Sequence, residues 1–171
     1  MSGVLIIASL IMLQSFLARA QATDAHYEIG IVYYSDGANF KAIDKEVVSQ
    51  GGRSTYSGKV KGAHATLRLQ DGLPRIFRVC GVDPSRFKLY RFKSERNVRT
   101  VTIAKVNMLI GGAKFVLPEA ELPVSIEASE GNCFALTPKS LLGDGEFGFS
   151  PTESADAFMF GVGDFKPSKK N

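Results

Sequence analysis

Short stretches of alternating hydrophobic and polar residues recur along most of the chain. The clearest lies at 63–70, where Ala65, Leu67 and Leu69 alternate with polar side chains, the pattern of a strand with one buried face. Other stretches are rich in β-branched and aromatic residues, which favour strands. We therefore predict strands at 63–70 and at 27–34, 75–80, 87–92, 98–109, 124–128, 133–137, 146–149 and 157–162.

Asp-Gly, Gly-Gly and Asp-Pro pairs separate these stretches and mark turns. Short strands joined by tight turns predict an all-β fold, either a mostly antiparallel β-sandwich or a partly open barrel. Residues 40–50 alone have helical spacing, with Gly51 as a stop signal, so we predict at most one short helix there. The apolar residues that would share one face of that helix are Phe40, Ile43, Val47 and Val48.

The first 22 residues have the pattern of a secretory signal peptide. Residues 4–17 are almost wholly apolar, a run that is short for a membrane span and typical of a signal, and cleavage sites follow Ala20 and Ala22. No Lys or Arg precedes this run, so a buried helix or a membrane anchor is the alternative. We predict export to the periplasm or the extracellular space, with no transmembrane segment left after cleavage. A single domain at 23–164 and a polar tail at 165–171 would form the mature chain.

The composition is that of a globular protein and excludes disordered and collagen-like classes, with 171 residues, 44% of them hydrophobic and 22% charged. A net charge of +4 hides a strongly basic segment at 75–105 and a strongly acidic one at 117–156. The basic segment indicates a surface for an anionic ligand. The alternative is that basic strands pair with acidic strands across a sheet. The predicted ligand-binding cations are Arg75, Arg78, Arg91, Lys93, Arg96 and Arg99.

Cys80 and Cys133 are the only cysteines, and export would place them in a compartment where disulfides form. If paired, they would close a loop of about 53 residues and stabilise the fold by roughly 4 kcal/mol in the chain-entropy account. The alternative is two buried free thiols, which pack as small hydrophobic side chains.

Catalytic motifs are scarce. The chain has two histidines, His26 and His64, and lacks the Gly-x-Ser-x-Gly, His-Glu-x-x-His and P-loop motifs. A serine hydrolase site on His64, a zinc site from the histidines and cysteines, and a Ca²⁺ site in the acidic loops all lack supporting spacing. We therefore predict no catalytic residue, metal or cofactor. The acidic residues considered for Ca²⁺ are Asp144, Glu146, Glu153, Asp156 and Asp164.

Several short motifs occur in a characteristic order. Tyr-Glu-x-Gly-x-Val-Tyr-Tyr opens the series, which ends with an aromatic strand; the motifs lie at 27–34, 96–101 (RNVRTV), 111–113 (GGA), 136–138 (LTP), 142–149 (LGDGEFGF) and 157–162. Together they resemble a group of uncharacterised secreted bacterial proteins that end in a Gly-Glu-Tyr-Gly/Ala-Phe motif, a loop and a final strand. Phe147 stands where that group has Tyr, and the cysteines are not part of its pattern. The resemblance implies export rather than an activity, because the group has no established one.

The motif residues Gly145, Glu146, Phe147 and Phe149 predict the start of a late β-hairpin that follows an Asp-Gly turn. Strand alternation places Phe147 and Phe149 on one face and Glu146 on the other. We expect Glu146 to cap the turn or to pair with an arginine such as Arg99.

These observations favour a secreted, non-enzymatic binding module whose basic segment, 75–99, meets an anionic envelope component. Another protein is a second class of partner, and we do not expect nucleic acid. The alternatives are a glycan-directed hydrolase that uses loop carboxylates within 144–156, because such pairs are defined by their separation in space, and a structural envelope component. Binding through charge would weaken as salt rises, whereas a hydrolase would lose turnover when single carboxylates become amides.

Overall fold

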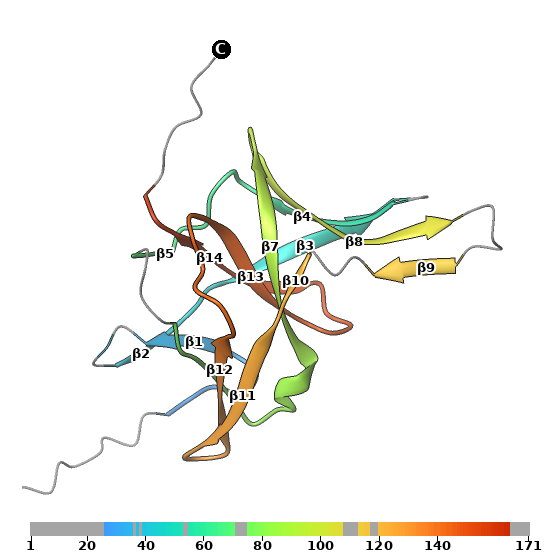
Figure 1. Ribbon diagram of the computed structural model, residues 1–171. Helices are drawn as coiled ribbons and strands as arrows, with labels where there is room; N and C mark the ends of the chain where they lie inside the picture. The colour runs from blue at the N-terminus through green and yellow to red at the C-terminus, as the bar shows by residue number, and fades with distance from the viewer. Residues whose placement is uncertain are drawn as a thin grey trace, which may run out of the picture.

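The computed structural model describes residues 26–35, 37, 39–52, 55–70, 75–107, 113–116 and 120–164 (Figure 1). These residues form strands in two sheets and no α-helix, with a single 3-10 turn at Pro84–Arg86. The prediction of a mostly antiparallel all-β fold is therefore confirmed. The predicted signal peptide and polar tail lie outside the described residues. Within the described part of the chain, no helix is long and apolar enough to cross a membrane.

The predicted helix at 40–50 is wrong, because this stretch forms strands β2 (Phe40–Ala42) and β3 (Lys45–Gly51). Val48 is 6% exposed, whereas its neighbour Val47 is 73% exposed. A helix would have placed both valines on one buried face. Because β3 pairs with a strand on each side, its successive side chains point to opposite faces, and Val47 and Val48 are separated. Hydrogen bonding between strands therefore overrides the helical spacing.

A closed barrel of six strands forms the larger part of the fold (Figure 1). Besides β3 it contains β4 (Thr55–Lys61), β7 (Phe87–Glu95), β8 (Val98–Asn107), β13 (Gly145–Pro151) and β14 (Asp156–Val162). The order is β7-β13-β14-β3-β4-β8, every neighbouring pair is antiparallel, and pairing of β8 with β7 closes the barrel. Shorter strands extend its wall: β5 (Arg68–Leu69) lies parallel to β14, β9 (Ala113–Val116) beside β8 and β10 (Glu121–Leu122) beside β7.

A second, open sheet lies against the barrel (Figure 1). Its strands are β2 (Phe40–Ala42), which lies at one edge, β1 (Val32–Ser35), β6 (Phe77–Cys80), β11 (Val124–Ser129) and β12 (Cys133–Pro138). The order is β11-β12-β6-β1-β2, and all pairs are antiparallel. The chain enters each sheet several times, so residues distant in sequence meet in both.

The core has two parts, one inside the barrel and one between the barrel wall and the open sheet. Ala157 and Met159 of β14 pack inside the barrel. Phe149 and Phe160, from β13 and β14, pack against Phe77 of the open sheet, with ring centroids 4.9 and 4.8 Å from it. Successive residues of a strand point to opposite faces, so one wall serves both cores.

The open sheet carries the disulfide between Cys80 and Cys133, which are directly opposed in the pairing of β6 with β12. The sulfur atoms are 2.02 Å apart. Of the two alternatives that the sequence left open, the structure therefore has the disulfide. A disulfide is typical of proteins that fold in oxidising compartments, and it is consistent with the predicted export.

Candidate functional site

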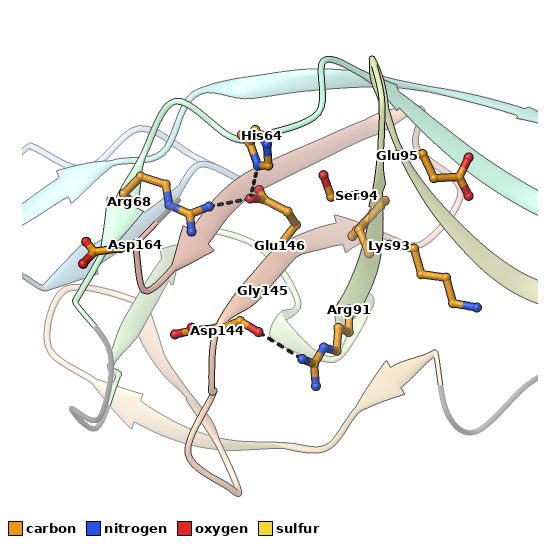
Figure 2. Close-up of a pocket in the computed structure, with 11 residues that line it drawn as sticks. His64, Arg68, Arg91, Lys93, Ser94, Glu95, Asp144, Gly145, Glu146 and Asp164 are labelled. Carbon is orange, nitrogen blue, oxygen red and sulfur yellow. Dashed lines mark hydrogen bonds and ion pairs between the residues drawn. The ribbon is translucent and has the colours of Figure 1, made fainter. Parts of the chain in front are cut away.

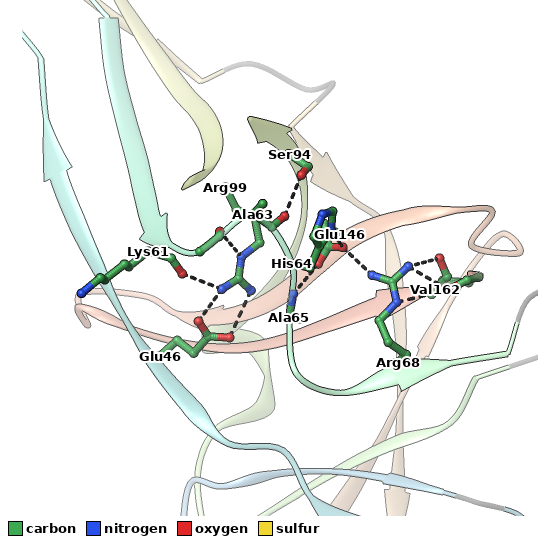
Figure 3. Close-up of polar contacts among 12 residues, drawn as sticks. Glu46, Lys61, Ala63, His64, Ala65, Arg68, Ser94, Arg99, Glu146 and Val162 are labelled. Carbon is green, nitrogen blue, oxygen red and sulfur yellow. Dashed lines mark hydrogen bonds and ion pairs between the residues drawn. The ribbon is translucent and has the colours of Figure 1, made fainter. Parts of the chain in front are cut away.

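Arg99 is the most deeply buried of the arginines predicted to bind ligand, and it is 1% exposed (Figure 3). Its two terminal nitrogens donate to the Glu46 carboxylate, one at 3.0 Å to Oε1, and its guanidinium also donates to the carbonyls of Lys61 and Gly62. Arg99 therefore joins β8 to β3 inside the barrel. Glu146 does pair with an arginine, as expected, but the partner is Arg68, and Arg99 pairs with Glu46 instead.

Arg78 lies on the open sheet. Its guanidinium carbon is 4.0 Å from the ring centroid of Phe40 and 5.2 Å from that of Tyr27, and it donates to the Tyr27 hydroxyl and to Ser129 Oγ. Arg78 thus holds the first described residues against the sheet. Its surroundings are those of a packing residue, with rings stacked on the guanidinium.

The six predicted cations do not form one surface. Arg75, just before β6, lines a small pocket beside Leu141, and Arg96 is exposed at the turn between β7 and β8. Arg91 and Lys93 are the two members that the structure brings together, on one side of β7. The candidate site therefore lies on this strand.

The basic hollow is a cavity of about 310 Å³ beside Arg91 and Lys93. Thr100, Thr102 and Lys105 of β8 also line it, and none of the three was among the predicted ligand-binding residues. None of its described lining residues is acidic, and none of its three cations forms an ion pair with a described residue. It therefore concentrates positive charge.

A bulge brings Lys105 into the basic hollow. In the pairing of β4 with β8 the register shifts after Ser57, so that Thr102 opposes Ser57 but Ala104 opposes Tyr56. One extra residue in β8 reverses the alternation beyond it, and Lys105 then faces the same side as Thr102. Strict alternation would have put these two residues on opposite faces, so the sequence pattern could not reveal this neighbour.

Arg91 is oriented by two contacts. Its Nη2 donates to the backbone carbonyl of Asp144 at 3.0 Å, and its guanidinium carbon lies 5.6 Å from the ring centroid of Phe147. Phe147 is directly opposite Arg91 in the pairing of β13 with β7. The motif at 142–149 thus supplies the ring under this cation.

The end hollow is a larger cavity of about 690 Å³ at one end of the barrel (Figure 2). It forms where the second half of β7 meets the start of β13, the residues just after β14, and β5 with the segment before it. Arg91 and Lys93 line it as well, so they form the wall shared by the two hollows. Its other polar residues are His64, Arg68, Ser94, Glu95, Asp144, Glu146 and Asp164.

Glu146 lies at the back of the end hollow and is 3% exposed (Figure 3). Its carboxylate accepts hydrogen bonds from the Ala65 amide at 2.9 Å and from Arg68, and His64 Nδ1 lies 3.0 Å from Oε1. Arg68 also donates to the carbonyls of Val162 and Gly163. The buried carboxylate is therefore compensated, and it fixes the orientation of His64.

The acidic residues proposed for hydrolysis do not meet at one place. Lys45 pairs with Asp156 at 3.8 Å, and Arg86 with Glu153 at 3.9 Å. Only Asp144 and Glu146 of that segment line a common hollow, and Glu146 is bound by Arg68. Within the described residues no group of three or more His, Cys, Asp or Glu side chains is placed to hold a metal ion.

Part of the basic segment does pair with the acidic one, as the alternative interpretation proposed. Lys88 and Glu121, from adjacent strands β7 and β10, lie 3.4 Å apart. Burial raises the pKa of the Tyr90 hydroxyl, and the negative charge of the same Glu121 carboxylate raises it further, to a smaller extent. Among the described residues, the positive charge of β7 is therefore neutralised at Lys88. Arg91 and Lys93, further along the strand, form no ion pair with a described residue.

No family model, no curated protein and no solved structure matches this chain.

Proposed function

We propose that this protein is an exported binding module whose ligand is anionic and occupies the basic hollow. The observation that carries the proposal is the wall of that hollow, where Arg91, Lys93 and Lys105 gather and no described lining residue is acidic. The hydroxyl of Thr102 adds an uncharged donor, whereas the hydroxyl of Thr100 donates to the Glu95 carboxylate at 3.3 Å. Oxygen atoms of phosphate, sulfate or carboxylate groups can accept hydrogen bonds from the three cations and from Thr102.

Contrast with the rest of the basic segment supports this choice. Arg86 and Lys88 have acidic partners, and the guanidinium of Arg99 is enclosed by Glu46 and two carbonyls. The cations of the basic hollow form no ion pair with a described residue, although Arg91 donates to the Asp144 carbonyl. Like charges gathered in a concave surface raise the local positive potential and favour an anion there.

Orientation of Arg91 adds to the expected affinity. An arginine that is free in solution loses side-chain entropy when it binds. Arg91 is already held by the Asp144 carbonyl and the Phe147 ring, so less entropy remains to be lost on binding. The arrangement favours binding over the hydrolase alternative, whose carboxylates are dispersed or already bound.

The test is the double variant Lys93→Gln/Lys105→Gln, compared with the unchanged mature protein. Affinity for dextran sulfate and for polyglutamate is measured by calorimetry at low and high salt. A hydrogen bond to a charged group contributes about 1.5–3 kcal/mol, so we expect the affinity to fall at least about tenfold. The salt dependence should also become shallower, since fewer counterions are released on binding.

The matched control is Arg96→Gln/Lys139→Gln, which removes the same charge from exposed positions outside the basic hollow. We expect this variant to bind almost as tightly as the unchanged protein. An equal loss in both double variants would show that net charge, rather than the basic hollow, governs binding, and would overturn the proposal.

A further inference from the structure

The two hollows differ in charge although they share a wall. Arg91 and Lys93 line both, so a ligand in the basic hollow that extends past this wall enters the end hollow. There it meets the carboxylates of Glu95, Asp144 and Asp164 (Figure 2). One continuous ligand must therefore present a negative group to the first hollow and a different chemistry to the second.

We propose that the ligand is an acidic polysaccharide in which a charged sugar is followed by an uncharged one. The charged group binds in the basic hollow, and the hydroxyls of the uncharged sugar bind in the end hollow. The proposal deepens the proposed function and rests on it, because the anionic group must bind where the three cations gather.

The carboxylates select hydroxyl groups. An ionised carboxylate only accepts hydrogen bonds, so its ligand must supply donors, and sugar hydroxyls are uncharged donors. Hydrogen bonds to a charged acceptor are the stronger kind. Ser94 and His64 line the same hollow, and the hydrogen bond to Glu146 keeps the His64 ring in place.

The same carboxylates disfavour a chain with a negative charge on every unit. In such a chain, for example a polynucleotide or polyphosphate, the unit beyond the Arg91 and Lys93 wall would lie among Glu95, Asp144 and Asp164. Repulsion between like charges at short range would oppose this placement. An acidic glycan with alternating charge avoids the conflict.

The experiment uses the double variant Glu95→Ala/Asp164→Ala, which removes two carboxylates that form no ion pair with a described residue. Two probes are titrated at the same salt concentration: hyaluronate oligosaccharides, in which a uronate alternates with an uncharged sugar, and polyphosphate. We expect affinity for hyaluronate to fall at least about tenfold through lost hydrogen bonds. Affinity for polyphosphate should rise, since less negative charge opposes it.

The opposite signs separate the two ideas. If affinity for both probes rises, the carboxylates only repel, and the proposed glycan contact is wrong while the anion site stands. The glycan contact is equally wrong if the unchanged protein binds polyphosphate but not hyaluronate. If Lys93→Gln/Lys105→Gln leaves binding of every probe unchanged, the proposed function itself is wrong, and this inference is wrong with it.

A control variant corrects for the change in net charge. Glu127→Ala/Glu130→Ala removes two carboxylates from exposed positions on the open sheet, away from both hollows. We expect hyaluronate affinity to stay the same or rise slightly in this control. Melting temperatures equal to that of the unchanged protein show that each variant is folded.

Discussion

Arg99 and Glu146 are buried charged residues, and each is satisfied by several partners. Arg99 binds Glu46 and two carbonyls, while Glu146 binds Arg68, His64 and the Ala65 amide. Removing one member of a buried ion pair typically costs about 3–5 kcal/mol, because the other is left uncompensated. These residues therefore tie strands of the barrel together, and their substitution would test folding before binding.

A glycine makes the Arg68 contact possible. A Cβ at Gly161 would lie 1.8 Å from Arg68 Nη1, so Gly161→Ala should displace the guanidinium from Glu146. We expect a loss of about 3 kcal/mol in the free energy of unfolding, since a buried carboxylate loses its partner. The measurement is urea denaturation. Gly143→Ala is the control, because a Cβ there meets no atom within 4 Å. Equal midpoints for both variants would contradict this account.

At the scale of elements, alternation predicted strands well where they pair on both sides. The predictions at 87–92, 133–137 and 157–162 correspond to β7, β12 and β14. The alternation at 63–70 was real but largely not a strand, since only Arg68–Leu69 joins a sheet. The residues before it cross the end of the barrel, where Ala65 is buried and its amide binds Glu146. In this segment alternate side chains are buried although no described strand pairs with it, and this produces the same alternation of apolar and polar residues as a strand.

Other elements left no usable signal. β4 has few apolar residues, and its Gly58 discourages a strand prediction. In the barrel that glycine is required, because a Cβ would lie 2.9 Å from Val48 Cγ1. The burial of Arg99 was also hidden, since its partner Glu46 lay within the predicted helix. Of the candidate site, Arg91 and Lys93 followed from charge, whereas Lys105 depends on a bulge that the sequence pattern does not reveal.

The disulfide is the covalent link between β6 and β12. Replacing both cysteines, as Cys80→Ser/Cys133→Ser, should lower the free energy of unfolding by roughly 4 kcal/mol, because the denatured chain gains the freedom of an open loop. The fold should persist, since both strands also pair through backbone hydrogen bonds. Thermal unfolding monitored by circular dichroism checks this. A variant as stable as the unchanged protein would show that the link is dispensable.

At the scale of the whole molecule, the chain alternates between the two sheets. β1 and β2 belong to the open sheet, β3 to β5 to the barrel, and β6 to the open sheet again; later strands repeat the exchange. Neither sheet is built from one continuous segment. The layer around Phe77, Phe149 and Phe160 joins them, so the two sheets should stabilise each other.

This coupling predicts that the barrel and the open sheet unfold together. In native-state hydrogen exchange, the most protected amides of β6 and of β13 should open with the same free energy and the same dependence on denaturant. Phe77→Ala removes a ring from the open sheet only, yet it should lower both opening free energies by about 3–5 kcal/mol.

Ile76→Ala is the matched control. The neighbouring Ile76 is 48% exposed, so its substitution should change both opening free energies little. If Phe77→Ala instead weakened β6 while β13 kept its protection, the open sheet would be a separate unit attached to a barrel that is stable by itself. The hollows, which are built almost wholly from barrel strands and their turns, would then survive loss of the open sheet. If the two sheets unfold together, the hollows are lost with the open sheet. Binding of an anionic ligand should then disappear in the same denaturant range as the hydrogen-exchange protection of the β6 amides.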